Sequence, residues 1–175
     1  MLGARSQNGL NGLFIYQDGQ WRTAASVNNT RLDGRVITSI GALKSVNNKF
    51  YAHFGTAGGG WALAEYAVDS WTTLVKRGDI MPNGAELSFI PARFDVNRNG
   101  DIVFIAFMNS GTGIVLRTVD GRNRLAYLSS DPNSASDPIV SFNSASFDLR
   151  DDRRFYFVAV DSLDRNVLYS AEPLF

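Results

Sequence analysis

The chain alternates between short hydrophobic runs and clusters of turn-forming residues. Two of the runs, Ile102–Phe107 and Phe155–Val160, are apolar on consecutive residues and follow stretches rich in Asp, Asn, Arg and Gly. Runs of this length, bounded by turn residues, predict β-strands. No long stretch has the i, i+3, i+4, i+7 apolar spacing of a helix, so the pattern predicts an all-β fold.

The β-rich runs recur at a nearly constant interval. Phe107 lies 53 residues after Phe54, and Val160 lies 53 residues after Phe107. Repetition with this period is a fold-level signal, and each unit has room for about four strands, which is close to the size of a β-propeller blade. The sequence therefore predicts a single all-β repeat domain over 1–175, with units at 8–36 (partial), 37–79, 87–131 and 139–175 (partial).

The two consecutive apolar runs indicate strands that are buried on both faces, because a sheet with one wet face would alternate. Without helices, such burial requires one sheet stacked on another. A β-propeller-like array of four-stranded antiparallel blades meets this requirement, and a β-sandwich is the alternative. The predicted strands make about three and a quarter blades, whereas a closed propeller has about 4–8. We therefore expect the ends of the array to be covered, by further repeats or by other copies of the chain.

Composition narrows the classes of partner. Lys plus Arg and Asp plus Glu each number 17, so no net charge attracts nucleic acid or an anionic membrane. No apolar run is long enough for a membrane span, and the first residues lack the features of a signal peptide. The absence of cysteine excludes disulfides and thiolate zinc sites.

A short motif connects the chain with a known family. Asn97–Phe104, with the sequence NRNGDIVF, fits N-x-x-G-x-x-[AV]-F. The chain resembles the NxxGxxAF tandem-repeat proteins, which are bacterial, propeller-like and usually found outside the cell or on its surface. In the unit at 139–175, Arg150 and Arg153 replace the Asn and Gly of the motif. The resemblance implies a scaffold or binding role and an extracellular or cell-surface location, and it carries no catalytic residues.

The same stretch is a candidate calcium loop. Asp95, Asn97, Asn99 and Asp101 fall at the first, third, fifth and seventh positions of a D-x-N-x-N-G pattern. The twelfth position is Ala106, where an EF-hand requires a bidentate Glu. We therefore interpret the stretch as a turn, keep calcium as the minor alternative, and predict no metal site or cofactor.

Other candidate chemistry has simpler interpretations. The only histidine, His53, lies in an apolar strand and is expected to be a buried structural residue. The glycine-rich Gly55–Trp61 is expected to be a hairpin loop, and the tripeptide Arg77–Asp79 the end of a strand. Leu149–Arg154 carries both charge signs and is expected to be a solvated turn with local salt bridges. No catalytic residues are predicted.

Aromatic residues are the candidate ligand-binding side chains. Trp61, beside the glycine loop, is expected to be exposed, and Tyr66 and Tyr16 complete the candidate binding set. Trp21 and Trp71 follow equivalent turns and are expected to pack between blades, with Leu125 as their counterpart in the next unit.

These observations favour a non-enzymatic interaction or assembly module that binds a protein partner or its own copies. The alternatives are a glycan-binding, lectin-like propeller and a fragment of a larger propeller enzyme.

Overall fold

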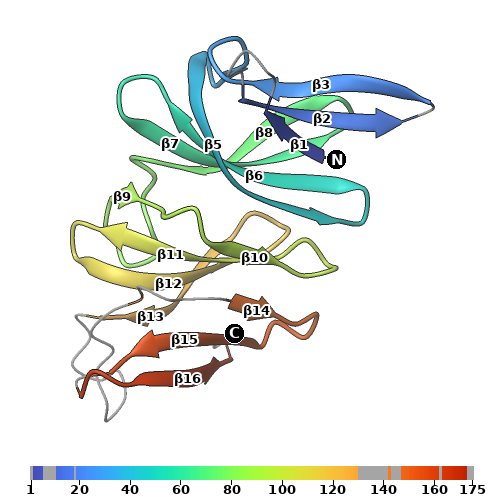
Figure 1. The fold of residues 1–175 in the computed structure, drawn as a ribbon. Helices are drawn as coiled ribbons and strands as arrows, with labels where there is room; N and C mark the ends of the chain where they lie inside the picture. Colours follow the sequence, from blue (N-terminus) through green and yellow to red (C-terminus); the bar gives the residue numbers. More distant parts are fainter. Residues whose placement is uncertain are drawn as a thin grey trace. The chain divides into compact units, whose positions relative to one another are not determined.

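The computed structural model describes residues 2–5, 11–17, 19–129, 142, 147–161 and 163–172. All regular secondary structure in these residues is β-strand, and every strand pairing is antiparallel (Figure 1). The predicted all-β class is confirmed. The described part of the chain contains no helix with the length and apolar character needed to cross a membrane.

The strands of the described residues form four sheets. The first sheet contains β1 (Leu2–Arg5), β2 (Asn11–Gln17) and β3 (Gln20–Ser26). The second contains β4 (Arg31–Leu32), β5 (Arg35–Val46), β6 (Lys49–Thr56), β7 (Gly60–Ala67) and β8 (Ser70–Lys76). The third contains β9 (Leu87–Phe89), β10 (Phe94–Val96), β11 (Ile102–Met108), β12 (Gly111–Arg117) and β13 (Asn123–Leu128). The fourth contains β14 (Phe147–Leu149), β15 (Phe155–Val160) and β16 (Asn166–Ala171).

The chain divides into two compact units, Met1–Lys76 and Arg77–Phe175. Within each unit, two sheets pack against each other through an apolar core. In the first unit, residues of β2 and β3 pack on β5, β6 and β7; the core residues are Leu13, Ala25, Leu32, Ile37, Ala52, Phe54, Ala62 and Ala64. In the second unit, β11 and β12 pack on β14 and β15; the core residues are Val103, Ile105, Ile114, Leu116, Phe142, Leu149, Phe155, Phe157 and Ala159.

The hairpins formed by the last two strands of the first, second and third sheets share one irregularity. One residue is left without a partner opposite it: Ala24 between β2 and β3, Leu74 between β7 and β8, and Ala126 between β12 and β13. Such bulges bend a strand and set which residues face each other. Counted from the bulge, Trp21 and Trp71 are equivalent, as predicted, but the counterpart in the next sheet is Asn123, not Leu125.

The bulges also correct the predicted repeat by one residue. Ala64 and Val115 lie on the strands opposite the bulge residues Leu74 and Ala126, each directly at the register shift. Ala64 pairs with Ala52, and Val115 pairs with Phe104. The central strands of the second and third sheets are therefore offset by 52 residues. Phe54 thus corresponds to Ala106, and its predicted equivalence with Phe107 is wrong. A shift of one residue reverses the face of the sheet. Phe54 is fully buried accordingly, whereas Phe107 is 39% exposed.

Between the third and fourth sheets the interval is 53 residues, as predicted. The pairs Phe94–Phe104 and Phe147–Phe157 occupy the same place in the two sheets. This register allows residues of the fourth sheet to be compared with those of the third, position by position.

Candidate functional site

The central strands of the third and fourth sheets differ in burial. In β11, neighbouring residues that point to opposite faces, such as Val103 and Phe104, are both fully buried. In β15, buried residues alternate with half-buried ones, among them Tyr156 and Val158. The prediction that Phe155–Val160 is buried on both faces is therefore wrong. Only one face of the fourth sheet packs on the third sheet.

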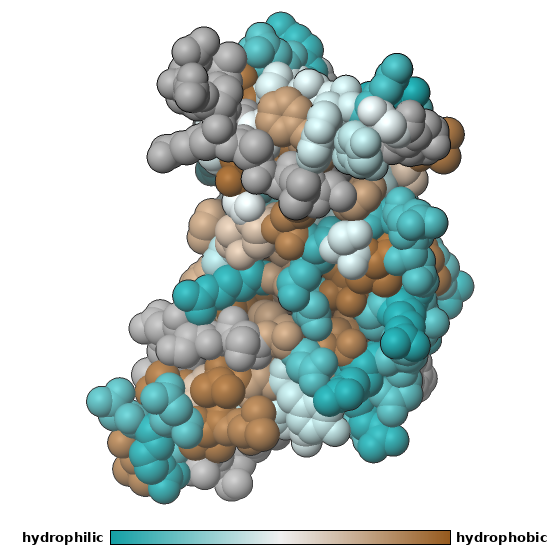
Figure 2. Space-filling model, turned by 45° about the vertical axis from the view of Figure 1, so that its right-hand side comes forward, coloured by the Kyte–Doolittle hydropathy of each residue, from teal (hydrophilic) through white to brown (hydrophobic). Residues whose placement is uncertain are grey.

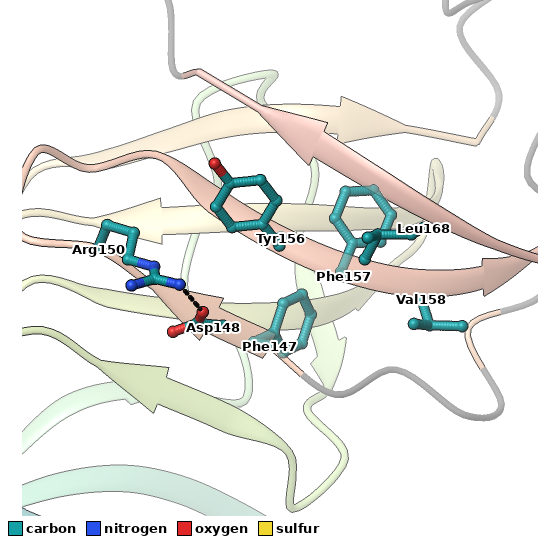
Figure 3. Close-up of a pocket in the computed structure, with 7 residues that line it drawn as sticks. All are labelled: Phe147, Asp148, Arg150, Tyr156, Phe157, Val158 and Leu168. Atoms are coloured by element: carbon teal, nitrogen blue, oxygen red, sulfur yellow. Dashed lines mark ion pairs between the residues drawn. The ribbon is translucent and has the colours of Figure 1, made fainter.

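The other face of the fourth sheet carries an open apolar groove of about 360 Å³ (Figure 3). We call this surface the outer face of the fourth sheet. The groove is lined by Phe147, Asp148, Arg150, Tyr156, Phe157, Val158 and Leu168. Leu168, in the middle of β16, is 68% exposed. In Figure 2, hydrophobic surface gathers over this sheet and is flanked by hydrophilic side chains.

One end of the groove is polar and the other is apolar. Arg150 Nη2 lies 2.8 Å from Asp148 Oδ2, and the guanidinium carbon of Arg150 is 5.9 Å from the centre of the Tyr156 ring. Figure 3 shows this ion pair at one end, Val158 and Leu168 at the other, and Tyr156 between them. An apolar centre with a charged rim is typical of a surface that binds another protein.

The outer face of the fourth sheet corresponds to a face that is covered in the third sheet. By register, Val158 and Leu168, which pair with each other, match Ile105 and Ile114. Ile105 and Ile114 are at most 1% exposed, because they belong to the core between the third and fourth sheets. In the fourth sheet, the positions that the third sheet uses to hold its neighbour are thus exposed at Leu168 and half-buried at Val158.

A second uncovered aromatic surface lies on the first sheet. Tyr16 and Trp21 pair across β2 and β3, their ring centres are 5.1 Å apart, and they are 59% and 56% exposed. We call this surface the aromatic face of the first sheet. The expectation that Trp21 packs in a core is wrong, whereas the same expectation holds for Trp71, which packs on the core of the first unit.

The three residues of the predicted binding set do not come together. Trp61 is 5% exposed and its ring stacks on His53 at 6.5 Å between ring centres, so the expectation of an exposed Trp61 is wrong. The loop beside it is exposed, but Trp61 itself is on β7. Tyr66 is also buried and donates a hydrogen bond to Asp69. Burial raises the pKa of the Tyr66 hydroxyl, and the Asp69 carboxylate raises it further. Of the set, Tyr16 remains accessible.

The candidate calcium loop is a hairpin turn whose side chains bind protein groups. Asn97 and Asp101 exchange two hydrogen bonds, Asn97 Nδ2 to Asp101 Oδ2 and Asp101 N to Asn97 Oδ1. Asp101 is fully buried and also accepts from Val119 N and from Arg153 Nε. No group of three or more His, Cys, Asp or Glu side chains is placed to hold a metal ion within the described ranges. The oxygens that suggested calcium are engaged in fixing the turn.

The same turn joins the third and fourth sheets. Asn97 Nδ2 donates to Arg150 O, and Asn99 Nδ2 donates to Asp151 O at 2.7 Å. In return, Asp95 Oδ2 accepts from Leu149 N at 2.9 Å. We call the contacts between 95–101 and 149–153 the inter-sheet clamp. The expected charged turn at Leu149–Arg154 is present, and it includes a bond to the buried Asp101 that sequence reasoning did not foresee.

Sequence reasoning missed the groove itself, because Tyr156, Val158 and Leu168 have the composition of a core. One signal was available. The position that holds the fully buried Leu116 in the third sheet is Ser170 in the fourth, since each pairs with an equivalent residue of the central strand. A polar residue in place of a buried leucine indicates a face that is less enclosed.

Comparisons with known proteins place the chain in no family. No family model matches it, and no curated protein is detectably similar. Among solved structures, the crystal structure of AofleA from Arthrobotrys oligospora is similar, with a TM-score of 0.46 and 15% sequence identity. The match covers 96% of this chain and 48% of that one, so this chain spans about half the length of AofleA. A likeness at this level does not bear on function.

Proposed function

We propose that this protein is a non-enzymatic assembly module whose copies associate through the outer face of the fourth sheet. The observation that carries the proposal is the register match between half-buried Val158 and exposed Leu168 on one side and the fully buried Ile105 and Ile114 on the other. Inside the chain, those buried positions hold a neighbouring sheet. The equivalent exposed positions are suited to hold another sheet in the same way.

The chemistry of the groove favours binding over catalysis. Its charged groups, Asp148 and Arg150, neutralise each other over 2.8 Å. A nucleophile activated by a neighbouring base would instead need an unneutralised pair within hydrogen-bond reach. Tyr156 and Leu168 provide the aromatic and aliphatic surface that is common in protein interfaces.

A β-propeller-like array is the architecture we propose for the assembly. Two sheets stack face to face in each unit, and each sheet is an antiparallel meander apart from β9, which pairs with β11. Closed propellers repeat this arrangement around an axis with about 4–8 blades. Association of copies would supply the blades that one chain lacks.

Carbohydrate binding is the second candidate function. It is favoured by the exposed Tyr16–Trp21 pair, whose rings offer an amphipathic surface of the kind that sugars stack on. Titration with simple sugars, followed by tryptophan fluorescence, tests it. A saturable change that is absent from Trp21→Phe would support this function.

The test of assembly is the mass in solution across a dilution series, measured by light scattering after size exclusion. The wild-type chain is expected to exceed the 19.2 kDa of one copy, and Leu168→Asp to dissociate. Burying a leucine contributes about 1.5–3 kcal/mol, so its replacement by a charge should weaken association at least about tenfold.

Leu163→Asp is the matched control. Leu163 is 66% exposed, close to the 68% of Leu168, but it lies in the turn between β15 and β16 and does not line the groove. This variant should assemble like the wild type. A wild-type chain that stays monomeric at all concentrations, or equal effects of the two variants, would refute the proposal.

A further inference from the structure

We infer that the surface that covers the outer face of the fourth sheet is the aromatic face of the first sheet of a second copy, so that the copies join head to tail. This inference rests on the proposed self-association and names its partner surface. It is carried by a comparison within the first unit, where one aromatic pair is covered and its equivalent is exposed.

The two aromatic pairs have nearly the same geometry. Counted from the bulges, Tyr16 and Trp21 in the first sheet match Tyr66 and Trp71 in the second. The ring centres are 5.1 Å apart in both pairs, and the ring planes are inclined by 49° and 56°. The pairs differ in burial, since Tyr66 is 8% exposed and Tyr16 is 59% exposed.

The first sheet is what covers the second pair. Trp71 packs on the core that contains Leu13 and Ala25 of β2 and β3. Its indole Nε1 donates to the carbonyl of Ala24, the bulge residue of β3, over 2.8 Å. The face that carries Tyr66 and Trp71 therefore receives the sheet that precedes it in the chain.

The same face of the first sheet carries Tyr16 and Trp21. Tyr16, like Tyr66, lies opposite its tryptophan on the adjacent strand. Side chains opposite each other in an antiparallel pair point to the same side of the sheet. By analogy with the second sheet, the aromatic face of the first sheet is built to receive a preceding sheet.

The chain thus exposes two unlike surfaces that complement each other. The fourth sheet exposes Leu168 and leaves Val158 half-buried, at positions that the third sheet turns toward a following sheet. The first sheet exposes Tyr16 and Trp21, at positions that the second sheet turns toward a preceding sheet. Placing the fourth sheet of one copy on the first sheet of the next continues the order of stacking that each unit already contains.

Contact between two unlike surfaces is heterologous. Such a contact closes into a ring if the rotation between copies allows, and otherwise continues as a filament. An isologous contact would instead pair the outer face of the fourth sheet with itself. Only the heterologous contact includes Trp21. A substitution of Trp21 therefore distinguishes the two arrangements.

The experiment uses two variants of the full chain that each block one surface, Trp21→Asp and Leu168→Asp. Each alone should remain monomeric in light scattering. Mixed in equal amounts, they retain one intact contact, between Leu168 of the Trp21→Asp copy and Trp21 of the Leu168→Asp copy. The mixture should therefore reach twice the 19.2 kDa chain mass and go no further.

Two further variants serve as controls. Val68→Asp introduces the same charge at a 98% exposed position in the turn between β7 and β8 and should assemble like the wild type. Tyr16→Asp blocks the same surface as Trp21→Asp and should behave like it. Agreement between the two variants would show that the effect does not come from misfolding of one of them. Circular dichroism of each variant should match the wild-type spectrum.

The outcomes separate the two claims. If Leu168→Asp dissociates the assembly while Trp21→Asp and Tyr16→Asp assemble normally, the head-to-tail contact is wrong and self-association through the fourth sheet stands. If both blocked variants are monomeric but their mixture forms no dimer, the head-to-tail contact is also wrong. If the wild-type chain is monomeric, both claims fail.

Discussion

Arg153 Nε lies 2.9 Å from Oδ2 of the fully buried Asp101, and the two residues belong to hairpin turns of different sheets. Arg153 occupies the place of the motif glycine and has a φ of 70°, beside 87° for Gly100 in the third sheet. An arginine therefore adopts the backbone conformation that usually selects glycine. Its side chain is directed at the buried carboxylate of the neighbouring turn.

Replacing Asp101 with alanine should destabilise the fold strongly. The substitution removes the acceptor for Val119 N and Arg153 Nε and one partner of Asn97. Leaving buried donors without an acceptor costs about 2–4 kcal/mol in the free energy of unfolding. Urea unfolding measures the loss. Asp152→Ala, which breaks an exposed pair with Arg154, is the control and should cost at most about 1 kcal/mol.

The backbone strain at Arg153 can be separated from its ion pair. In the wild-type background, Arg153→Gly should destabilise, because the buried Asp101 loses a charged partner. In the Asp101→Ala background, the same change should destabilise the fold less than in the wild type, because the Asp101 partner is already absent and glycine relieves the left-handed conformation. Equal losses in both backgrounds, measured by urea unfolding, would contradict this account.

The contribution of the Trp71 indole hydrogen bond to the free energy of unfolding should be measurable. Trp71→Phe removes the donor to Ala24 O and part of the ring that packs on the core, with an expected cost of about 1–2 kcal/mol. Trp21→Phe, at the exposed equivalent, should change the stability by less than about 0.5 kcal/mol. Thermal unfolding at a concentration where the chain is monomeric compares the two. A larger loss for Trp21→Phe would show that its ring is buried within one chain.

Asp161 should contribute to the loss of folding stability at low pH. The Arg165 guanidinium, which donates to Asp161 Oδ2 at 2.7 Å, holds the pKa of the Asp161 carboxyl below its ordinary value of 3.8, and backbone N–H groups of Arg165 and Leu163 lower it further. Because the folded pKa is the lower one, the stabilisation is present above about pH 4 and is lost as the pH falls through the folded pKa.

Thermal midpoints between about pH 4 and pH 2 test the role of Asp161. Asp161→Asn removes the titrating group, and Arg165→Gln removes the main cause of the shift. Both variants should be less stable than the wild type near neutral pH and should lose less stability on acidification. An unchanged pH dependence in Asp161→Asn would show that other carboxyl groups account for the effect.

Calcium should leave the stability unchanged. The oxygens of Asp95, Asn97 and Asp101 accept hydrogen bonds from protein groups, so an ion would have to displace them. A ligand that binds the folded state raises the unfolding midpoint in proportion to its saturation. Millimolar calcium should therefore give the same thermal midpoint as a chelator. A saturable increase of the thermal midpoint with calcium concentration that is lost in Asp101→Asn would instead support a calcium site.

The fold class was predictable because it depends on local signals. Turn-forming residues and short apolar runs indicated strands, and Phe155–Val160 was placed at the bounds that β15 has. The offset between Phe54 and Phe107 was not predictable in the same way. A constant interval in sequence does not reveal the register of the strands, which becomes visible only in the strand pairing and in the equivalent bulges at Leu74 and Ala126.

The candidate site was largely hidden from the sequence, since exposure of a face depends on how sheets stack. Val158 and Ile105 are both aliphatic residues of central strands, yet only the latter is enclosed. Trp61 was misplaced for the opposite reason. Ala57, Gly58 and Gly59 of the glycine loop are exposed, but the strand that begins at Gly60 carries Trp61 into a buried position.

The meander topology of the four sheets has a consequence for synthesis of the protein. Apart from β9, which pairs with β11, every strand pairs with its immediate neighbour in sequence. Local pairing of this kind keeps the loss of chain entropy on folding small and speeds folding. Each sheet can therefore form soon after its last strand leaves the ribosome, and the cores of the two units can close in order, from the first unit to the second.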